Sequence, residues 1–329
     1  MSLPTTLNYI KLKTAPSHES ELKDGDVFVK HLYFSNDPTQ RVYIQKDSVP
    51  SRCYMDPVLE GEPMRAFGIS EIILSKSDKY APGDLVYGTF SWSDYQVINE
   101  AFVWMKIDDK TFDIPTQLSN LGHTGLTAYF GLTHVLKMKE GQTIVISAAA
   151  GATGSVAVQI AKHMLKSAKV IGLAGTEDKC RWVESLGADI CINYHDADYK
   201  EQLDKAIGPD YIDLYFDNVG GEMLSHMFTR VKKFGRIAAC GSIIGYNDDD
   251  KNKLTNWTNL IFNYLTVEGF IVTNYAEHFP EAFGFLIEGL STGKIKNEGS
   301  YYPLTKVPEI LDLIFGSKKP NGKLLTRIA

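Results

Sequence analysis

The sequence has little of what marks several large classes of protein. It contains only four cysteines, Cys53, Cys180, Cys191 and Cys240, with no C-x-x-C pair, which argues against a disulfide framework, so reduced thiols in the cytosol are expected. The net charge is −6, from 34 basic and 40 acidic residues, and this lack of basic charge argues against general nucleic-acid binding. Residues 1–13 lack a basic segment followed by an apolar one, so we predict no signal peptide and expect a cytoplasmic protein.

The signatures of metal sites and of membrane spans are also missing. The eight histidines show neither H-x-x-x-H nor H-E-x-x-H spacing, so we predict no metal site and no zinc-dependent alcohol dehydrogenase mechanism. The absence of G-x-S-x-G weakens a hydrolase interpretation. One uncharged stretch, Thr143–Ala161, contains Gly151, Gly154 and several polar residues. Its pattern changes midway, which predicts a strand, a tight loop and a helix instead of a membrane span.

The spacing of turn residues and apolar runs divides the chain into a β-rich first third and a longer α/β region. In the first third, short apolar runs such as Val27–Val29 and Ile69–Leu74 alternate with turns, which predicts a β-rich barrel or sandwich. After a helix expected at Leu118–Leu136, continuous apolar runs alternate with helical patterns, as in a parallel sheet covered on both faces. The fold class is therefore α/β with a doubly wound parallel sheet. Its six predicted strands are Thr143–Ser147, Lys169–Ala174, Ile190–Asn193, Tyr211–Phe216, Gly235–Cys240 and, at an edge, Thr266–Val272.

A glycine loop follows the first of these strands. The spacing Ala149-x-Gly151-x-x-Gly154 resembles G-x-G-x-x-G with alanine in the first position, and a helical pattern begins directly after it. Such a loop lets the backbone approach a pyrophosphate and points the N–H groups of a helix at the negative charge. The alternative is a packing turn with no ligand. Its place at the first strand of a six-strand βα series favours a dinucleotide site.

The residues beyond the second strand bear on the choice of cofactor. Sites for NAD usually carry Asp or Glu about 20 residues after the glycines, whereas Gly175 and Thr176 stand there in this chain. Thr176 is predicted to cap a helix whose first turn holds Glu177 and Asp178, and Lys179 can reach a 2′-phosphate. An ordinary solvated lysine is the alternative, and the two acids would oppose a phosphate if they faced it. The absence of an acid after the strand favours NADPH over NADH.

Several longer runs match a known family. The most specific are Gly-Leu-Thr-Ala-Tyr-Phe-Gly-Leu at residues 125–132 and Tyr-Phe-Asp-Asn-Val-Gly-Gly at residues 215–221. Further matching segments are Ser35–Pro38, Trp92–Tyr95, Lys232–Ala238, Glu268–Val272 and Asn321–Lys323. On these runs the chain resembles the zinc-independent medium-chain dehydrogenase/reductases, in the branch of prostaglandin reductase and the alkenal double-bond reductases.

This resemblance implies a domain arrangement, a cofactor and an assembly. A β-rich, GroES-like catalytic domain is expected from residues 1–121 and 300–329, and a dinucleotide-binding Rossmann domain from residues 122–299. A homodimer that binds NADPH and a small-molecule substrate, with no membrane or nucleic-acid partner, is also implied. The expected cofactor contacts, including the glycine loop, are Gly151, Ala152, Thr153, Gly154, Ser155, Lys179, Tyr194, Asn218, Cys240, Gly241, Ser242, Tyr246, Phe270, Ile271, Val272 and Asn321.

The implied reaction is the reduction of the C=C bond of an α,β-unsaturated aldehyde or ketone by metal-free hydride transfer to the β-carbon. The enolate oxygen then needs hydrogen-bond donors and the α-carbon needs a proton. Tyr246 and Tyr264 are the predicted catalytic residues, since the family's tyrosine near the nicotinamide falls on Phe262, two residues before Tyr264. Water or a ribose hydroxyl is the alternative proton source. The alternative functions are a quinone or carbonyl reductase and an NADPH-binding protein without turnover.

Overall fold

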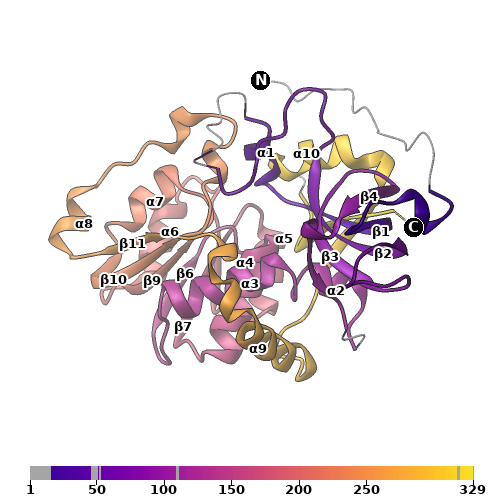
Figure 1. Ribbon diagram of the computed structural model, residues 1–329. Helices are drawn as coiled ribbons and strands as arrows, with labels where there is room; N and C mark the ends of the chain where they lie inside the picture. The colour runs from indigo at the N-terminus through magenta and orange to yellow at the C-terminus, as the bar shows by residue number, and fades with distance from the viewer. Residues whose placement is uncertain (1–15, 46–50, 52, 109–110, 317–318, 329) are drawn as a thin grey trace. The chain divides into compact units, whose positions relative to one another are not determined.

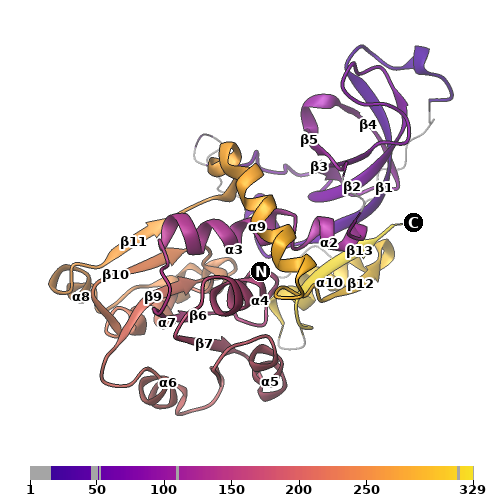
Figure 2. The same cartoon turned by 90° about the horizontal axis from the view of Figure 1, so that it is seen from below.

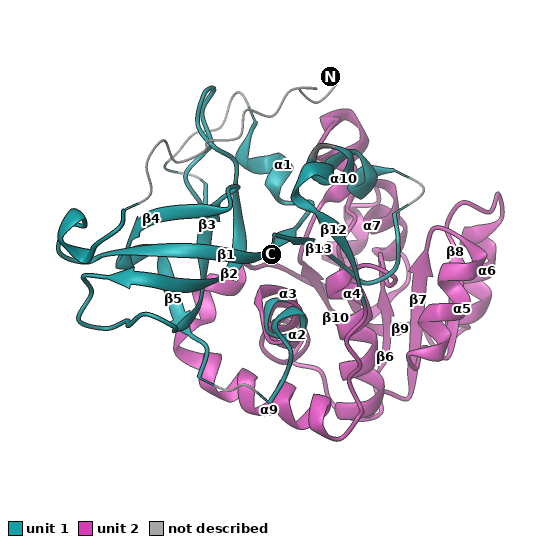
Figure 3. Ribbon diagram, turned by 90° about the vertical axis from the view of Figure 1, so that its right-hand side faces the viewer, with its two compact units in different colours: residues 1–118, 299–329 teal, residues 119–298 magenta. Residues whose placement is uncertain are grey.

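The chain divides into two units that are built on different sheets (Figure 3). Unit 1 comprises Met1–Leu118 and Gly299–Ala329, and unit 2 comprises Ser119–Glu298. The computed structural model describes residues 16–45, 51, 53–108, 111–316 and 319–328. Each unit has its own buried apolar core, so each is described separately.

Unit 1 is a mixed sheet in which the C-terminal tail joins the N-terminal strands. The strand order is β12-β13-β1-β2-β3-β5, and β4 also pairs with β1. The strands β1 and β13 are antiparallel, whereas β12 and β13 are parallel. The strands are β1 (Asp26–Asn36), β2 (Arg65–Ser75), β3 (Leu85–Ser91), β4 (Tyr95–Asn99), β5 (Val103–Lys106), β12 (Gly299–Pro303) and β13 (Lys323–Arg327), and the helices are α1 (Gln40–Tyr43), α2 (Ile114–Leu118) and α10 (Val307–Phe315).

A buried ion pair ties the tail of unit 1 to the end of β1. Lys323 Nζ lies 2.6 Å from Asp37 Oδ1, and both side chains are almost fully buried. Burial lowers the pKa of Lys323, and the carboxylate of Asp37 opposes this effect. Because a buried charge without its partner is costly, the pair fixes the place of β13 against β1.

Unit 2 is a six-stranded parallel sheet in the order β11-β10-β9-β6-β7-β8 (Figure 1). Successive strands run outward from β6 in one direction and from β9 in the other, so the order reverses between these two strands. In open α/β sheets, ligands bind at the carboxyl ends of the strands at such a switch point. The strands are β6 (Thr143–Ile146), β7 (Lys169–Ala174), β8 (Ile190–Asn193), β9 (Ile212–Asp217), β10 (Val231–Ala239) and β11 (Thr266–Gly269).

Helices cover both faces of the parallel sheet. On one face α6 and α7 pack against apolar strand residues such as Val145, Ile171 and Tyr215, and α3, α4 and α9 lie together on the other (Figures 1 and 2). The predicted doubly wound α/β fold class is therefore confirmed. The helices are α3 (His123–Phe130), α4 (Ala152–Gln159), α5 (Glu177–Ser185), α6 (Tyr199–Ile207), α7 (Gly221–Met227), α8 (Thr258–Phe262) and α9 (Phe279–Ser291), and π-helical turns extend α3 (η4, Gly131–Val135) and α4 (η5, Ile160–Met164).

Three predicted elements differ in the structure. The strand expected at Gly235–Cys240 begins four residues earlier, as β10. The helix expected at Leu118–Leu136 is interrupted, because α2 ends at Leu118 and α3 begins only at His123. Between them the chain turns so tightly that a Cβ on Gly125 would lie 1.7 Å from the carbonyl oxygen of Asn120. The last strand ends at Gly269 instead of Val272, since Phe270 turns inward and packs against Phe216. Among the described residues, no helix combines the length and apolar character that a membrane crossing needs.

Candidate functional site

The glycine loop lies between β6 and α4 and depends on one close backbone approach. Ala148 has a φ of +47°, which turns the chain away from the strand, and Gly151 caps the helix. A Cβ on Gly154 would lie 2.3 Å from the carbonyl oxygen of Ala148. Only glycine therefore fits, and α4 sits directly against the loop, as the third glycine of a dinucleotide motif requires.

The start of α4 presents backbone donors that the helix itself does not use. The N–H of Ser155 donates to the carbonyl of Gly151 at 2.9 Å and makes the first hydrogen bond of the helix. The N–H groups of Ala152, Thr153 and Gly154 precede that bond, so the helix itself offers them no acceptor. With the positive end of the helix dipole, these donors can hold a phosphate. The loop and helix N-terminus thus fit the pyrophosphate of a dinucleotide.

Asp217, at the end of β9, organises the switch point beside this loop. Its buried carboxylate accepts hydrogen bonds from the N–H groups of Val219 and Gly220, each at 3.1 Å from Oδ1, and from Tyr215 Oη at 2.9 Å. Burial raises the pKa of Asp217, and these donors oppose the rise. Ser147 Oγ, at the end of β6, lies 3.3 Å from the same carboxylate. The carboxylate therefore links the ends of β6 and β9.

Asn218 and the loop after β10 are held by the same group of contacts. Asn218 donates its backbone N–H to Ser147 Oγ and its side-chain amide to Ser147 O, both at 2.8 Å. The carbonyl of Asp217 accepts the N–H of Cys240 at 2.8 Å and that of Gly241 at 3.1 Å. The structure thus brings together three of the predicted contact positions at the carboxyl edge of the sheet.

Tyr246 lies over this loop. Its hydroxyl oxygen accepts the N–H of Ser242 at 3.4 Å, and a Cβ on Gly241 would meet the same oxygen at 3.4 Å. Burial, together with the nearby Asp217 carboxylate, raises the pKa of the Cys240 thiol to about 12. The thiol is therefore protonated at neutral pH and acts as a neutral packing group, whereas Tyr246 offers a hydroxyl at the same edge of the sheet.

A second cluster lies after β7 and β8, where the 2′-position of an adenosine ribose is expected. A Cβ on Gly175 would lie 2.8 Å from Tyr194 Oη, so the glycine leaves room for that ring. Lys179 is half-buried on α5, and burial lowers its pKa. Within the described part of the chain it has no ion pair, while Arg181 pairs with Glu177 at 3.4 Å.

The acids of the first turn of α5 are thus engaged along their own helix. Arg181 also lies 3.9 Å from Asp178, and both acids are exposed. The Thr176 hydroxyl caps the helix by accepting the N–H of Lys179 at 3.2 Å. A half-buried ammonium group with no carboxylate bound to it in the described residues suits a phosphate better than a ribose hydroxyl.

The remaining predicted residues fall in three places. Phe270, Ile271 and Val272 follow β11 at the same edge of the sheet, where Phe270 packs against Phe216 with ring centroids 6.4 Å apart. Asn321 belongs to unit 1, so its contact with the cofactor stays a prediction. Tyr264 precedes β11 and therefore lies at the amino ends of the strands, where it stacks on Phe234 at 5.1 Å. The structure does not bring Tyr264 together with the cofactor residues of its own chain.

Sequence reasoning missed Ser147 and Asp217. Both are fully or almost fully buried polar residues at the ends of apolar strands, with exposed fractions of 0% and 1%. A polar residue that ends an otherwise apolar strand is the signal that could have found them, because a buried polar group must have partners.

The chain is similar to known oxidoreductases in family, sequence and structure. Residues 152–288 match the family model described as zinc-binding dehydrogenase, and residues 3–106 match that described as N-terminal domain of oxidoreductase. The NADP(+)-dependent 2-alkenal reductase of Nicotiana tabacum is 35% identical over 82% of this chain and 78% of its own. Prostaglandin reductase 1 of Bos taurus is 34% identical over 84% of this chain and 81% of its own.

A solved structure is also similar over nearly the whole chain. CurA from Vibrio vulnificus, in complex with NADPH, superposes with a TM-score of 0.85 and is 27% identical. The superposition covers 97% of this chain and 93% of that one.

The substitution Gly154→Ala tests the close approach in the glycine loop. Its Cβ would meet a backbone oxygen, which cannot rotate away, so α4 must move off the loop. We expect NADPH to bind at least about tenfold more weakly, measured by calorimetry, because the N–H donors leave their positions. Gly284→Ala, in α9, where the new Cβ would meet nothing within 4 Å beyond the backbone of its own helix, is the matched control and should keep its affinity. Equal affinities in the two variants would contradict this account.

Proposed function

Because the chain belongs to the zinc-independent medium-chain dehydrogenase/reductases, in the branch of the prostaglandin and alkenal reductases, we propose that it reduces the C=C bond of α,β-unsaturated aldehydes and ketones. The chain is an NADP-dependent oxidoreductase. In the structure, the observation that supports the cofactor assignment is the half-buried Lys179, with the neighbouring acids paired to Arg181. When bound, NADPH supplies the hydride that reduces the β-carbon of the substrate.

The residues of the chain hold and orient this cofactor at three points. The N–H groups at the start of α4 bind the pyrophosphate, and Lys179 with Tyr194 binds the 2′-phosphate. Asn218, Gly241 and the Phe270–Val272 segment lie at the carboxyl ends of β9, β10 and β11, where they support the nicotinamide half. These contacts fix the reacting end of the cofactor relative to the sheet, so that orientation contributes to the rate.

Tyr246 is the side chain that we assign to the enolate. Its hydroxyl follows β10 at the same edge as Asn218 and Gly241, and a phenolic O–H can donate a hydrogen bond. Donating to the enolate oxygen stabilises charge that develops only as the β-carbon is reduced. Tyr264 lies at the amino ends of the strands, whereas the predicted cofactor contacts lie at their carboxyl ends. Tyr246 is therefore the stronger of the two candidates within one chain.

An assay with three substrate classes tests the proposed function. NADPH oxidation is measured with 2-alkenals, with quinones and with saturated aldehydes, each with and without a metal chelator. We expect the highest kcat/KM with 2-alkenals and no loss with chelator, since none of the assigned residues needs a metal. Preference for quinones or for saturated aldehydes would establish the alternative reductases. Tight NADPH binding without turnover on any substrate would establish the non-catalytic alternative.

The substitution Lys179→Ala tests the choice of cofactor. A charge-assisted contact with the 2′-phosphate should contribute roughly 1.5–3 kcal/mol, so the KM for NADPH should rise about ten- to a hundredfold. The KM for NADH should hardly change, because NADH lacks that phosphate. Lys205→Ala, at an exposed lysine of α6, controls for the loss of one charge. Equal losses for both cofactors would show that Lys179 supports the fold instead.

The substitution Tyr246→Phe tests the hydrogen bond to the enolate. We expect kcat at saturating NADPH to fall at least about tenfold, which corresponds to about 1.4 kcal/mol of transition-state stabilisation. Tyr211→Phe, which removes a hydroxyl from an exposed tyrosine of unit 2, is the matched control. A loss of less than about threefold would assign the proton to water or to the ribose hydroxyl. If kcat fell only in Tyr264→Phe, the catalytic role would belong to Tyr264 instead of Tyr246.

We further propose a homodimer formed along β11. This strand is the edge of the parallel sheet, and exposed strand edges invite pairing with another chain. Large apolar side chains gather at its start: Phe234, Ile261, Phe262 and Tyr264 are 69%, 58%, 71% and 60% exposed, respectively. An apolar edge of this kind is typical of a two-fold interface. The alternative is that a loop covers the edge strand, and the high exposed fractions of these four side chains argue against it.

Sedimentation at micromolar concentration tests the assembly. We expect a dimer mass for the unchanged chain and a monomer mass for Phe262→Asp, because a buried unpaired carboxylate is costly at an apolar interface. Phe102→Asp, at an apolar residue of unit 1 that is 52% exposed, should remain a dimer. A monomer mass for the unchanged chain would refute the proposal.

A further inference from the structure

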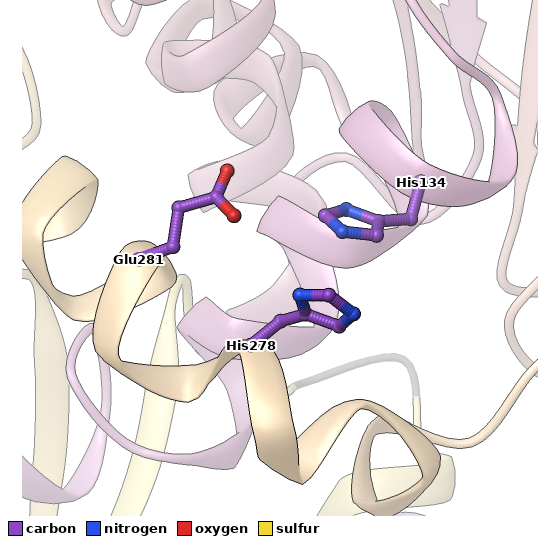
Figure 4. A group of neighbouring side chains, drawn as sticks. All are labelled: His134, His278 and Glu281. Carbon is purple, nitrogen blue, oxygen red and sulfur yellow. The ribbon is translucent and has the colours of Figure 1, made fainter.

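Three metal-ligating side chains meet on unit 2, at residues other than those assigned to the dinucleotide. His134 belongs to the π-helical turn η4, His278 is the N-cap residue of α9, and Glu281 lies in the first turn of α9 (Figure 4). One potential ligand atom from each lies within 4.8 Å of those from the other two. His134 is half-buried, whereas His278 and Glu281 are exposed. The described part of the chain holds no other cluster of this kind.

The hydrogen bonds around His134 fix which of its nitrogens is available. Thr133 Oγ1 donates its only proton to the carbonyl of Tyr129 at 2.7 Å. The same oxygen lies 2.9 Å from His134 Nδ1, so in that contact it must accept, and Nδ1 must carry the proton. A neutral imidazole with its proton on Nδ1 presents a lone pair at Nε2. This is the arrangement found in metal-binding histidines, whose second nitrogen donates to a neighbouring oxygen.

The ring of His134 is also held in place by packing. Its centroid lies 5.0 Å from that of Phe130 and 5.5 Å from that of Tyr275. The ring of His278 approaches it to 5.2 Å. A ligand that is oriented before the metal arrives loses little conformational entropy on binding, which favours affinity.

Glu281 has a supporting partner from α3, directly before the turn that holds His134. Tyr129 Oη donates to Glu281 Oε1 at 2.7 Å, which leaves Oε2 for another partner. The carboxylate points toward the side of the two imidazoles (Figure 4), and the hydrogen bond from Tyr129 restrains it there. Tyr129 and Thr133 thus position two of the three side chains. Hydrogen bonds of this kind around the ligands orient them in metal sites.

We propose that His134, His278 and Glu281 bind a divalent transition metal ion, with Zn²⁺ as the best fit, through Nε2, an imidazole nitrogen and Oε2. Two imidazoles and one carboxylate are a donor set that suits zinc, nickel and copper and not magnesium or calcium, which take oxygen ligands. In tetrahedral zinc sites the ligand atoms lie about 3.4 Å apart, from metal–ligand distances of about 2.1 Å. The exposed His278 and Glu281 therefore rotate inward by roughly an ångström, and water completes the coordination.

The experiment is a titration of the tag-free protein, without NADPH, with Zn²⁺ in a calorimeter and with Co²⁺ in a spectrophotometer. We expect about one ion per chain and visible absorption bands from Co²⁺ at reduced coordination number. Zn²⁺ should also raise the midpoint of thermal unfolding, since it binds only the folded chain. His278→Ala and Glu281→Gln should each weaken Zn²⁺ binding at least about tenfold, and Tyr129→Phe should weaken it by about tenfold through the lost orientation of Glu281.

His18→Ala, at an exposed histidine of unit 1, is the matched control and should bind Zn²⁺ as the unchanged chain does. Circular dichroism checks that every variant is folded. Equal Zn²⁺ affinity in the unchanged chain and in a His134→Ala/His278→Ala double variant would overturn the proposal. Reductase turnover is not the readout, so the proposed function and the metal site can fail separately.

Discussion

One buried carboxylate, Asp217, holds the carboxyl edge of the parallel sheet in place. Its Oδ1 accepts from two backbone N–H groups and from Tyr215 Oη, and Ser147 lies beside it at the end of the neighbouring strand. Four donors around one carboxylate offset the cost of taking it out of water. Because these donors come from the ends of β6 and β9 and from the loop after β9, the switch point cannot open without leaving a buried acceptor unpaired.

The two ends of the proposed dinucleotide site would attract phosphate in different ways. At the expected pyrophosphate position, Gly154 lets a helix N-terminus approach the loop, and backbone dipoles supply the positive potential. At the expected 2′-phosphate, a side-chain cation supplies it, because Lys179 is half-buried with no carboxylate paired to it in the described residues. Backbone donors bind any dinucleotide, whereas the lysine can distinguish NADPH from NADH. Affinity and cofactor choice are therefore separable within one site.

Much of this fold could be predicted from the sequence because its signals are local. Apolar runs separated by helical patterns predict β6 to β10 and the doubly wound class, and Gly154 marks the loop. Features that depend on distant contacts could not be predicted. The break before α3 arises from the packing of Gly125 on Asn120, and the position of Tyr264 follows from the direction of β11. His134 and Glu281 are far apart in the chain, so no spacing rule reveals their meeting.

A row of packed rings connects the switch point to the histidine cluster within unit 2. Phe216 of β9 contacts Phe270, Phe270 contacts Tyr275, and Tyr275 stacks on Phe130 at 4.8 Å. Phe130 then packs against His134, which faces His278. Close-packed rings cannot shift singly without opening voids. The segment that begins at Phe270 is thus held at one end by the sheet and at the other by the contact of His278 with His134. A metal ion bound by these two histidines would therefore restrain the segment that is expected beside the nicotinamide.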